Sequence, residues 1–511
     1  MFARLPSVGL FGMQAYIVEV EADISSGLPG FDVVGLPDAA VRESRERVRS
    51  ALKNCGFEFP VSRITANLAP ADIRKEGPLY DLPLLLAILK ATKQLQFDEG
   101  DSVFLGELSL TGEVRPINGV LPMVIEAQKQ GFSHAFVPAD NAAEGAVVEG
   151  IQVYPVEHIK QLIAHLSGEK HIQAASQKDA PQEDGVPLLD FADVRGQEEA
   201  KRALEVAAAG GHNVLLIGSP GSGKSMLAKR LPSILPDMTF EEKLETTMLH
   251  SISGNLRPGS SLVQTRPFRS PHHTVSPAAL AGGGSVPRPG ELSLSHNGVL
   301  FLDELPEFSR PSLEVLRQPL EDGKVTISRV GGTFSYPCSV MLVCAMNPCP
   351  CGYYGHPTRP CTCNKRSANA YLSKISGPLL DRIDIHVEVP PVQFDALSDK
   401  RPSESSAAIK ERVNRARDIQ RERYKDMDFS CNARLTPSSI REACPMTDGA
   451  EAMLRQAFDI LGLSARAYDR VLKVSRTIAD LDGAQIIDAA HVAEAIQYRN
   501  LDRKYWSREQ K

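Results

Sequence analysis

The stretch GSPGSGKS, residues 218–225, constrains the fold of this chain more than any other feature of its sequence. It follows the apolar run HNVLLI and precedes MLAKRLPSIL, which has helical periodicity, so it matches G-x-x-x-x-G-K-[ST] between a strand and a helix. There, glycines let successive backbone N–H groups turn around phosphates, and the helix N-terminus adds partial positive charge. The pattern therefore predicts a nucleotide-binding α/β domain rather than a chance glycine-rich turn.

The loop also predicts individual roles. Lys224 should reach the β- and γ-phosphates, and the hydroxyl of Ser225 should bind Mg²⁺. The predicted nucleotide-binding residues of the loop are Gly218, Ser219, Pro220, Gly221, Ser222, Gly223, Lys224 and Ser225.

Two further apolar runs end in polar residues that suit hydrolysis. HNGVLFLDE predicts a strand neighbouring the phosphate-loop strand, with Asp303 holding Mg²⁺ through water and Glu304 polarising the attacking water. SVMLVCAMN predicts a third strand, which places Asn347 beside the γ-phosphate or that water. The alternative is that Asp303 and Glu304 are merely two surface acids at a strand end. This alternative is weak because the chain also has a phosphate loop. The combination predicts an ATPase.

The 511 residues suffice for about three domains. Residues 1–167 mix strand-like stretches such as AYIVEVEAD with the amphipathic, helix-like DAAVRESRERVRSALKN. Residues 168–187 are polar and contain two prolines, which predicts a linker. The strand-loop-helix pattern of residues 188–391 then gives way, in residues 392–511, to helical periodicity.

Composition limits the possible partners and compartment. The net charge of −6 gives no support for nucleic-acid binding, so any such binding needs a local basic surface. The longest strongly apolar run, LPLLLAIL, is too short to span a bilayer, and the N-terminus lacks a signal-peptide pattern. We therefore expect a cytoplasmic protein without a membrane partner. Clustered cysteines in that reducing compartment favour metal over disulfide.

The segment CPCGYYGHPTRPCTC, residues 349–363, holds four of the nine cysteines. Four thiolates in two C-x-C pairs predict a tetrahedral, structural Zn²⁺ site, with His356 as a spare ligand. A catalytic zinc is not expected because all four positions are filled. The alternative is a loop of reduced thiols held by its glycines and prolines. The predicted zinc ligands are Cys349, Cys351, Cys361 and Cys363.

The central domain resembles the magnesium-chelatase-like branch of the AAA+ ATPases through GVLFLDELPEF, AMNPCPCGYYG and SGPLLDRIDIHVEVP. The resemblance implies a ring, usually a hexamer, with ATP bound between subunits. On this basis Arg382 is the arginine finger donated to the neighbouring subunit, and Arg466 is the second sensor arginine on a helical lid. The alternative is that both arginines form surface ion pairs.

Two other segments resemble loops that project into the pore of such rings. RPFRSPHHTVSPAALAGGGSVPRPGELSLSHNG resembles the helix-2 insert, and GKVTISRVGGTFSYP predicts a tight hairpin at Gly331 and Gly332. Their basic residues are either phosphate contacts or merely solvated loop charges. The candidate DNA-binding residues are Arg269, Arg288, Lys324 and Arg329.

The N-terminal region resembles the proteolytic α+β domain of Lon proteases, of the ribosomal S5 domain 2-like fold, through RKEGPLYDLPLLLAIL and LGELSLTGEVRPINGVLPMVIEA. The family pattern puts a serine where this chain has Leu79, and a lysine where Val120 and Leu121 follow Gly119. Leucine provides neither a nucleophile nor a base, so we predict an inactive domain.

An inactive Lon-like domain joined to a magnesium-chelatase-like AAA+ domain is the architecture of the ComM/YifB family. The resemblance implies an ATP-dependent, ring-forming helicase that acts on single-stranded or branched DNA and promotes branch migration in natural transformation. The alternatives are a magnesium-chelatase-type motor subunit and an AAA+ remodeller of a protein partner. The Lon-like domain argues against the chelatase.

Overall fold

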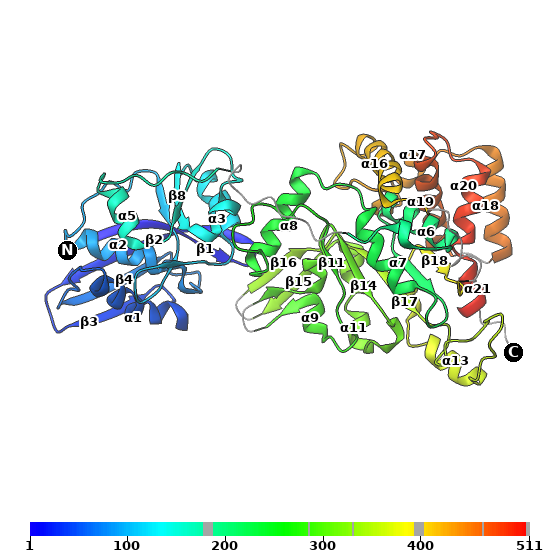
Figure 1. Cartoon of the computed structure of the whole chain (residues 1–511), viewed down its shortest axis with the longest axis horizontal. Coiled ribbons are helices and arrows are strands. Elements are labelled where there is room, and N and C mark those ends of the chain that lie inside the picture. Colours follow the sequence, from blue (N-terminus) through cyan, green and yellow to red (C-terminus); the bar gives the residue numbers. More distant parts are fainter. Residues whose placement is uncertain (177–187, 285–286, 330–331, 393–402, 462–463, 507–511) are drawn as a thin grey trace. The chain divides into compact units, whose positions relative to one another are not determined.

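The computed structural model describes residues 1–176, 188–284, 287–329, 332–392, 403–461 and 464–506 (Figure 1). The chain forms two compact units. Unit 1 contains residues 1–184 together with 240–264, and unit 2 contains residues 185–239 together with 265–511. No helix among the described residues is both long enough and apolar enough to cross a membrane.

Unit 1 has a four-stranded sheet of order β1-β2-β4-β3 and a parallel three-stranded sheet of order β5-β8-β9. The strands are β1 (Phe2–Phe11), β2 (Gln14–Ser25), β3 (Gly30–Val34), β4 (Arg63–Ala69), β5 (Ser102–Phe104), β8 (His134–Pro138) and β9 (Gln152–Val156), with a small ladder of β6 (Glu107–Leu108) and β7 (Val114–Arg115). The helices are α1 (Ala39–Asn54), α2 (Asp81–Ala91), α3 (Val120–Lys129), α4 (Ala142–Gly145) and α5 (Ile159–Leu166).

The predicted local structure of unit 1 is confirmed. AYIVEVEAD lies in β2, and the charged amphipathic segment forms α1, whose N-terminus is capped by Asp38 accepting from the Val41 N–H at 2.8 Å. LPLLLAIL lies in α2 and is buried on all sides. Leu79, Val120 and Leu121 are buried too. The positions that would carry a protease dyad therefore hold buried apolar side chains.

Helix α8 (Phe240–Ile252) packs in unit 1, although its sequence lies between segments of the nucleotide-binding domain. Ser251 donates a hydrogen bond to Glu144, and the Ser251 carbonyl accepts from the Gly119 N–H at 3.1 Å. Burial raises the pKa of Glu144, and the Ser251 hydroxyl supplies a partner for that carboxylate. The sequence boundaries placed α8 in the nucleotide-binding domain, because periodicity does not say which core a helix joins.

Part of the segment predicted as a linker, residues 168–187, is packed against unit 1. Ile172 is buried, and the Ala175 N–H donates to the Val153 carbonyl at 2.7 Å, so residues 172–175 dock onto unit 1. Residues 177–187 lie outside the described part of the chain.

Unit 2 is built on a parallel five-stranded sheet of order β11-β14-β17-β10-β18. Its strands are β10 (Val214–Ile217), β11 (Phe268–Arg269), β14 (Val299–Leu302), β17 (Met341–Met346) and β18 (Ile385–Glu388). We expected the strand before Asp303 to lie next to the phosphate-loop strand, but β17 pairs between them. The sequence shows which segments are strands, and their lateral order depends on how the connections pack.

The other elements of this unit are mostly helices (Figure 1). The helices before β18 are α6 (Glu198–Gly210), α7 (Lys224–Arg230), α9 (Pro277–Ala281), α10 (Glu291–Leu294), α11 (Arg310–Glu314), α12 (Arg317–Asp322), α13 (Lys365–Leu372) and α14 (Gly377–Leu380). The predicted helical C-terminal region is confirmed by α16 (Ser406–Arg423), α17 (Ile440–Ala443), α18 (Asp448–Leu461), α19 (Ala465–Leu481), α20 (Ala489–Gln497) and α21 (Asn500–Trp506).

Two short ladders lie in the segments that we expected to project into a ring pore. The hairpin strands β15 (Lys324–Arg329) and β16 (Gly332–Pro337) pair antiparallel, and β12 (Gly282–Gly283) pairs with β13 (Arg288–Pro289). Gly332, which we placed in the turn, is the first residue of β16 and pairs with Arg329. Gly331 lies outside the described residues.

Candidate ATP site and cysteine cluster

The phosphate loop connects β10 to α7, as predicted. The Nζ of Lys224 donates to the carbonyls of Gly218 and Ser219, both at 2.9 Å, and to Asn347 Oδ1 at 3.2 Å. Burial lowers the pKa of this ammonium group, while the nearby carboxylates of Asp303 and Glu304 act in the opposite direction. Lys224 is thus a buried cation centred among the loop, the β17 terminus and the acidic pair.

Ser225 and Asp303, the two residues predicted to hold Mg²⁺, are in direct contact. The Ser225 hydroxyl donates to Asp303 Oδ2 at 2.6 Å, although 78 residues separate the two in sequence. Asp303 Oδ1 accepts from the Glu304 N–H at 3.0 Å. A hydroxyl and a carboxylate are hard oxygen donors of the kind that Mg²⁺ prefers, so these side chains fit that ion.

Glu304 has an unusual backbone conformation, and its side chain faces a histidine that we did not predict to be part of the site. Its φ of 53° is left-handed, which is uncommon for a residue with a side chain. Its exposed carboxylate lies 3.8 Å from Nδ1 of His273, which belongs to the helix-2 insert segment. The sequence signal for His273 was the adjacent histidine pair in SPHHTVSP, within a glycine- and proline-rich loop.

Asn347, the predicted arginine finger and the predicted second sensor arginine occupy different settings. Asn347 follows β17 and contacts Lys224 directly. Arg382 is mostly buried: its Nε donates to the Arg317 carbonyl at 2.9 Å, and its Nη2 lies 2.5 Å from Glu321 Oε1. Arg466 is exposed in the first turn of α19.

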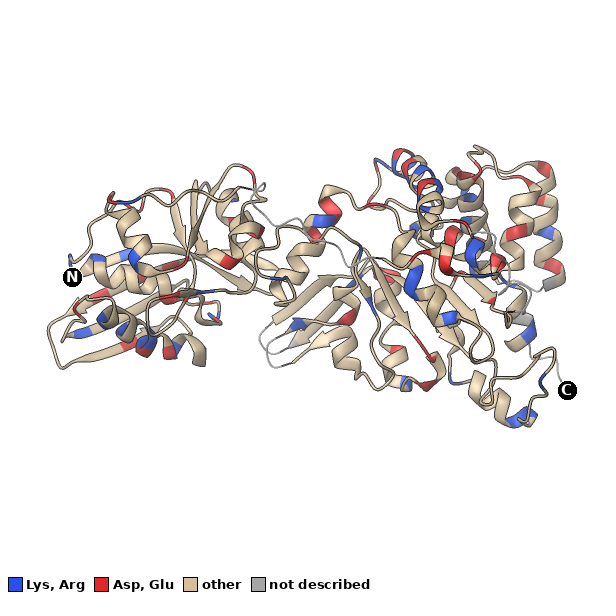
Figure 2. Ribbon diagram, in the orientation of Figure 1, with Lys and Arg blue, Asp and Glu red and all other residues tan. Residues whose placement is uncertain are grey.

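The four candidate DNA contacts also differ. Arg269 forms two hydrogen bonds with Glu291, at 2.7 and 2.8 Å, and is thereby engaged within the fold. Arg288 on β13 and Lys324 on β15 are exposed. The side chain of Arg329 lies outside the described residues. Elsewhere the charges are mixed, as in α16, which carries side chains of both signs (Figure 2).

The cysteine cluster brings four sulfur atoms together. The Sγ of Cys349 lies 3.4 Å from that of Cys351 and 3.7 Å from that of Cys361, and all four lie within 4.8 Å of one another. A tetrahedral Zn²⁺ site with Zn–S bonds of ~2.3 Å has edges of about 3.8 Å, so the spacing suits a metal. The Cys351 N–H points to Cys363 Sγ at 3.4 Å. The cluster therefore has the ligands for a metal ion, and Cys349 is its buried member.

His356 has another role in this loop. Its Nδ1 accepts from the N–H groups of Thr358 and Arg359, at 3.2 and 3.0 Å. This ring nitrogen is therefore occupied by the turn.

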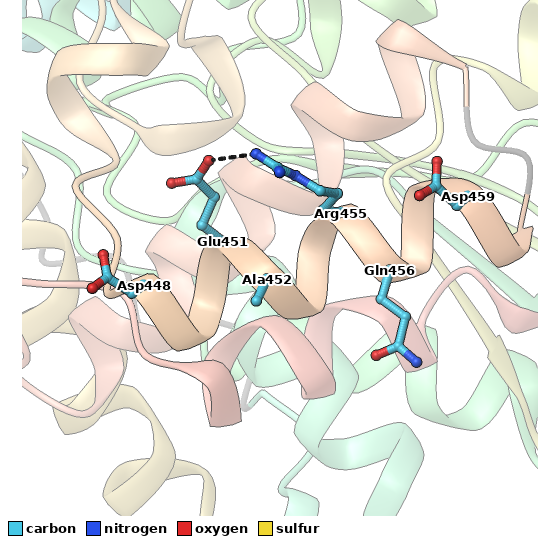
Figure 3. A pocket seen from close by; sticks show the side chains of 6 residues that line it. All are labelled: Asp448, Glu451, Ala452, Arg455, Gln456 and Asp459. Carbon is cyan, nitrogen blue, oxygen red and sulfur yellow. Dashed lines mark hydrogen bonds and ion pairs between the residues drawn. The ribbon is translucent and has the colours of Figure 1, made fainter.

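A separate shallow hollow of about 520 Å³ lies along α18. Its lining residues all come from that one helix, and Figure 3 shows their side chains spread along the helix rather than converging. The Glu451–Arg455 ion pair, at 3.3 Å, is the interaction drawn there. None of the predicted site residues lines this hollow.

Comparison with known families gives the class of the protein. The family described as magnesium chelatase, subunit ChlI, matches residues 190–397, and the C-terminal family of that subunit matches residues 403–499. A third family, described as subunit ChlI of Mg-chelatase, matches residues 20–141. Together with the parallel sheet and the phosphate loop, these matches define an AAA+ ATPase of the magnesium-chelatase type, with ATP and Mg²⁺ as the cofactors that its site suits.

Individual relatives narrow the class. YifB of Escherichia coli strain K12 is 44% identical over 495 residues, and competence protein ComM of Haemophilus influenzae is 44% identical over 503 residues. Each match covers 96% of both chains. The chain therefore belongs to the ComM/YifB family. Lon protease of Mycolicibacterium smegmatis is 26% identical over 164 residues, covering 30% of this chain and 21% of the protease, which agrees with the Lon-like N-terminal region.

Proposed function

We propose that this protein is an ATP-dependent DNA motor that assembles as a hexameric ring and drives branch migration of recombination intermediates. The observation that carries the proposal is a set of contacts that joins the hydrolytic site to the helix-2 insert, and the insert to the β15–β16 hairpin. A relative covering nearly the whole chain is named a competence protein, which favours DNA as the substrate. Such a motor would work in the cytoplasm, where the chromosome lies.

The path begins at Glu304 and runs through the helix-2 insert. His273 of the insert faces Glu304, and two residues further on the Val275 carbonyl accepts from the Ser312 hydroxyl at 2.9 Å. The insert then reaches the β15–β16 hairpin, where the Tyr336 hydroxyl donates to the Pro287 carbonyl at 2.9 Å. We propose that a change at the γ-phosphate is transmitted along the insert to both loops.

The exposed ends of this path carry the DNA contacts. Arg288 and Lys324 are solvent-accessible on β13 and β15, and Arg329 follows on the same hairpin. Cations on backbone loops suit phosphate contacts that do not depend on base sequence. Sequence-independent contact is what a motor that moves along DNA requires.

Within the ATP site we assign the roles as follows. Lys224 and the loop bind the phosphates, Ser225 and Asp303 hold Mg²⁺, Glu304 orients the attacking water, and Asn347 senses the γ-phosphate. Arg382 acts on the neighbouring subunit's nucleotide and Arg466 acts from the helical lid. A positive charge supplied in trans stabilises the transition state and makes hydrolysis depend on the contact between subunits.

For the cysteine cluster we propose a structural Zn²⁺. Four thiolates at tetrahedral spacing leave no open position for substrate, which is typical of structural zinc. The metal would supply folding free energy to a loop that is too poor in apolar residues to form its own core.

The test is migration of a labelled three-stranded DNA junction by the full-length protein with ATP and Mg²⁺. We expect migration by the wild type and none by Lys224→Ala or Glu304→Gln. Glu304→Gln should still bind ATP, because it removes the base and leaves the phosphate contacts. ATP hydrolysis by the wild type without binding or movement of any junction would reject the DNA motor and favour a protein or tetrapyrrole substrate.

A further inference from the structure

The cysteine cluster lies directly against the phosphate loop. A Cβ placed on Gly352, between Cys351 and Tyr353, would lie 2.4 Å from Cδ and 2.6 Å from Cγ of Pro220. The Gly352 backbone, with φ of +82°, therefore rests on the proline ring at the middle of the loop. No larger residue fits at this position without moving one of the two segments.

The same segment is tied to the site through the chain itself. Cys349 is two residues from Asn347, whose Oδ1 lies 3.2 Å from Lys224 Nζ. The Gly352 N–H donates to the Cys349 carbonyl at 2.9 Å, which folds the first C-x-C pair into a tight turn. A displacement of this turn therefore changes two parts of the site together, the Pro220 contact and the position of Asn347.

On its other side the phosphate loop meets strand ends. The Gly218 N–H donates to the Met346 carbonyl at 3.2 Å. A Cβ on Gly218 would lie 2.3 Å from the Val389 carbonyl oxygen. The phosphate loop thus contacts the ends of β17 and β18 at Gly218. At Pro220 it contacts the cysteine segment.

The C-terminal helix α21 connects the cysteine segment back to β18. The rings of Tyr354 and Tyr505 lie 6.3 Å apart, centre to centre. Lys504 donates to Glu388 Oε2 at 2.7 Å, and Glu388 is the last residue of β18. Helix α21 therefore gives the cysteine segment a second contact, in addition to the one at Pro220.

We propose that the metal bound by the four cysteines sets the affinity of the ATP site by holding Gly352 against Pro220. The inference rests on the ATP site and the structural Zn²⁺ of the proposed function. The two C-x-C pairs are separated by nine residues rich in glycine, proline and polar side chains, so the metal is what closes this loop. Without it the loop gains conformational freedom, and Gly352 and Asn347 lose their fixed positions. The metal is a positioning element and contacts no reacting atom.

The first test compares two glycine substitutions in the same loop. Gly352→Ala and Gly355→Ala both place a side chain at positive φ, +82° and +75°. At Gly355 the new Cβ meets only the flexible end of Lys504, at 3.8 Å. Binding of a fluorescent ATP analogue to the full-length protein is measured with Mg²⁺ and without DNA, and zinc per chain is measured by mass spectrometry.

We expect both variants to retain one zinc per chain. Gly352→Ala should bind the analogue about tenfold or more weakly, and Gly355→Ala within about twofold of the wild type. Equal affinity of Gly352→Ala and the wild type at full zinc occupancy would overturn the proposal. Because the measurement omits DNA, a failure of branch migration leaves this result unaffected.

The second test removes the metal. A chelator that prefers Zn²⁺ over Mg²⁺ is applied to the wild-type protein, and analogue binding is followed together with zinc content. Affinity should fall as zinc is lost and return when ZnCl₂ and a reducing agent are added. Unchanged affinity in the zinc-free protein, or a purified protein that neither contains nor takes up zinc, would overturn the proposal.

Discussion

Arg382 is paired with Glu321 of its own chain, with 2.5 Å between Nη2 and Oε1, and only 12% of its side chain is exposed. A residue that acts on a neighbouring subunit's nucleotide must release such a partner first. Glu321 is about half exposed, so its carboxylate can be resolvated when the arginine leaves. If Arg382 acts in trans as proposed, the ion pair with Glu321 and the hydrogen bonds to the Arg317 and Pro378 carbonyls must all be broken first.

The first prediction concerns this arginine. Arg382→Ala should lower the rate of ATP hydrolysis by about 10³-fold while ATP binding changes little, because the lost charge acts in the transition state. The matched control is Arg455→Ala on the exposed face of α18, which should hydrolyse ATP at the wild-type rate. Steady-state hydrolysis and analogue binding separate the two effects, and a wild-type rate for Arg382→Ala would exclude a finger role.

The second prediction concerns Mg²⁺. Asp303→Asn should raise the Mg²⁺ concentration needed for half-maximal hydrolysis by about tenfold, since an amide holds the ion less well than a carboxylate. Asp322→Asn, at the exposed end of α12, is the control and should leave the Mg²⁺ titration unchanged. An unaltered titration for Asp303→Asn would remove this residue from the metal site.

The third prediction concerns the basic loops. The double variant Arg288→Ala, Lys324→Ala should weaken binding to single-stranded DNA. It should also reduce the slope of log K against log salt by about 0.7 for each phosphate that the variant no longer neutralises. Lys425→Ala, at an exposed position two residues beyond the end of α16, should keep both the affinity and the slope. Weaker binding with an unchanged slope would mean that neither side chain binds phosphate.

The fourth prediction concerns stability and pH. Asp384 faces His212 Nδ1 at 3.2 Å and Arg470 Nε at 3.8 Å. Burial opposes ionisation, but the His212 hydrogen bond and the charges of Arg470 and Lys473 outweigh it and hold the pKa of Asp384 below its ordinary value. The ionised carboxylate is therefore favoured in the folded state.

Because the pKa falls on folding, this contribution is complete above the unfolded value of about 3.9 and is lost as the pH drops through the folded value. Asp384→Asn should lower the free energy of unfolding at pH 7 by about 3 kcal/mol. The difference from the wild type should narrow below about pH 4. Urea unfolding at several pH values measures this, with Asp418→Asn as the exposed control. A difference independent of pH would mean that the charge of Asp384 is not what matters.

Much of this protein is determined by local sequence. Backbone N–H groups can turn around phosphates wherever glycines occur at the right spacing between a strand and a helix. The position of Lys224 and Ser225 in a phosphate loop was therefore predictable from eight residues. Asp303 and Asn347 were predictable because each ends an apolar strand, and ends of parallel strands meet at one edge of a sheet. The proximity of the four cysteines followed from their spacing in a short loop.

Other relationships depend on packing between segments that are far apart in the chain. The sequence shows neither that β17 lies between β10 and β14, nor that α8 joins unit 1, nor that Arg269 is engaged by Glu291. Nor does it show that Gly352 rests on Pro220. Local patterns report backbone preferences over a few residues, so they identify the chemical groups of the site. Which groups touch is decided by the tertiary structure, because burial and close packing are properties of the whole fold.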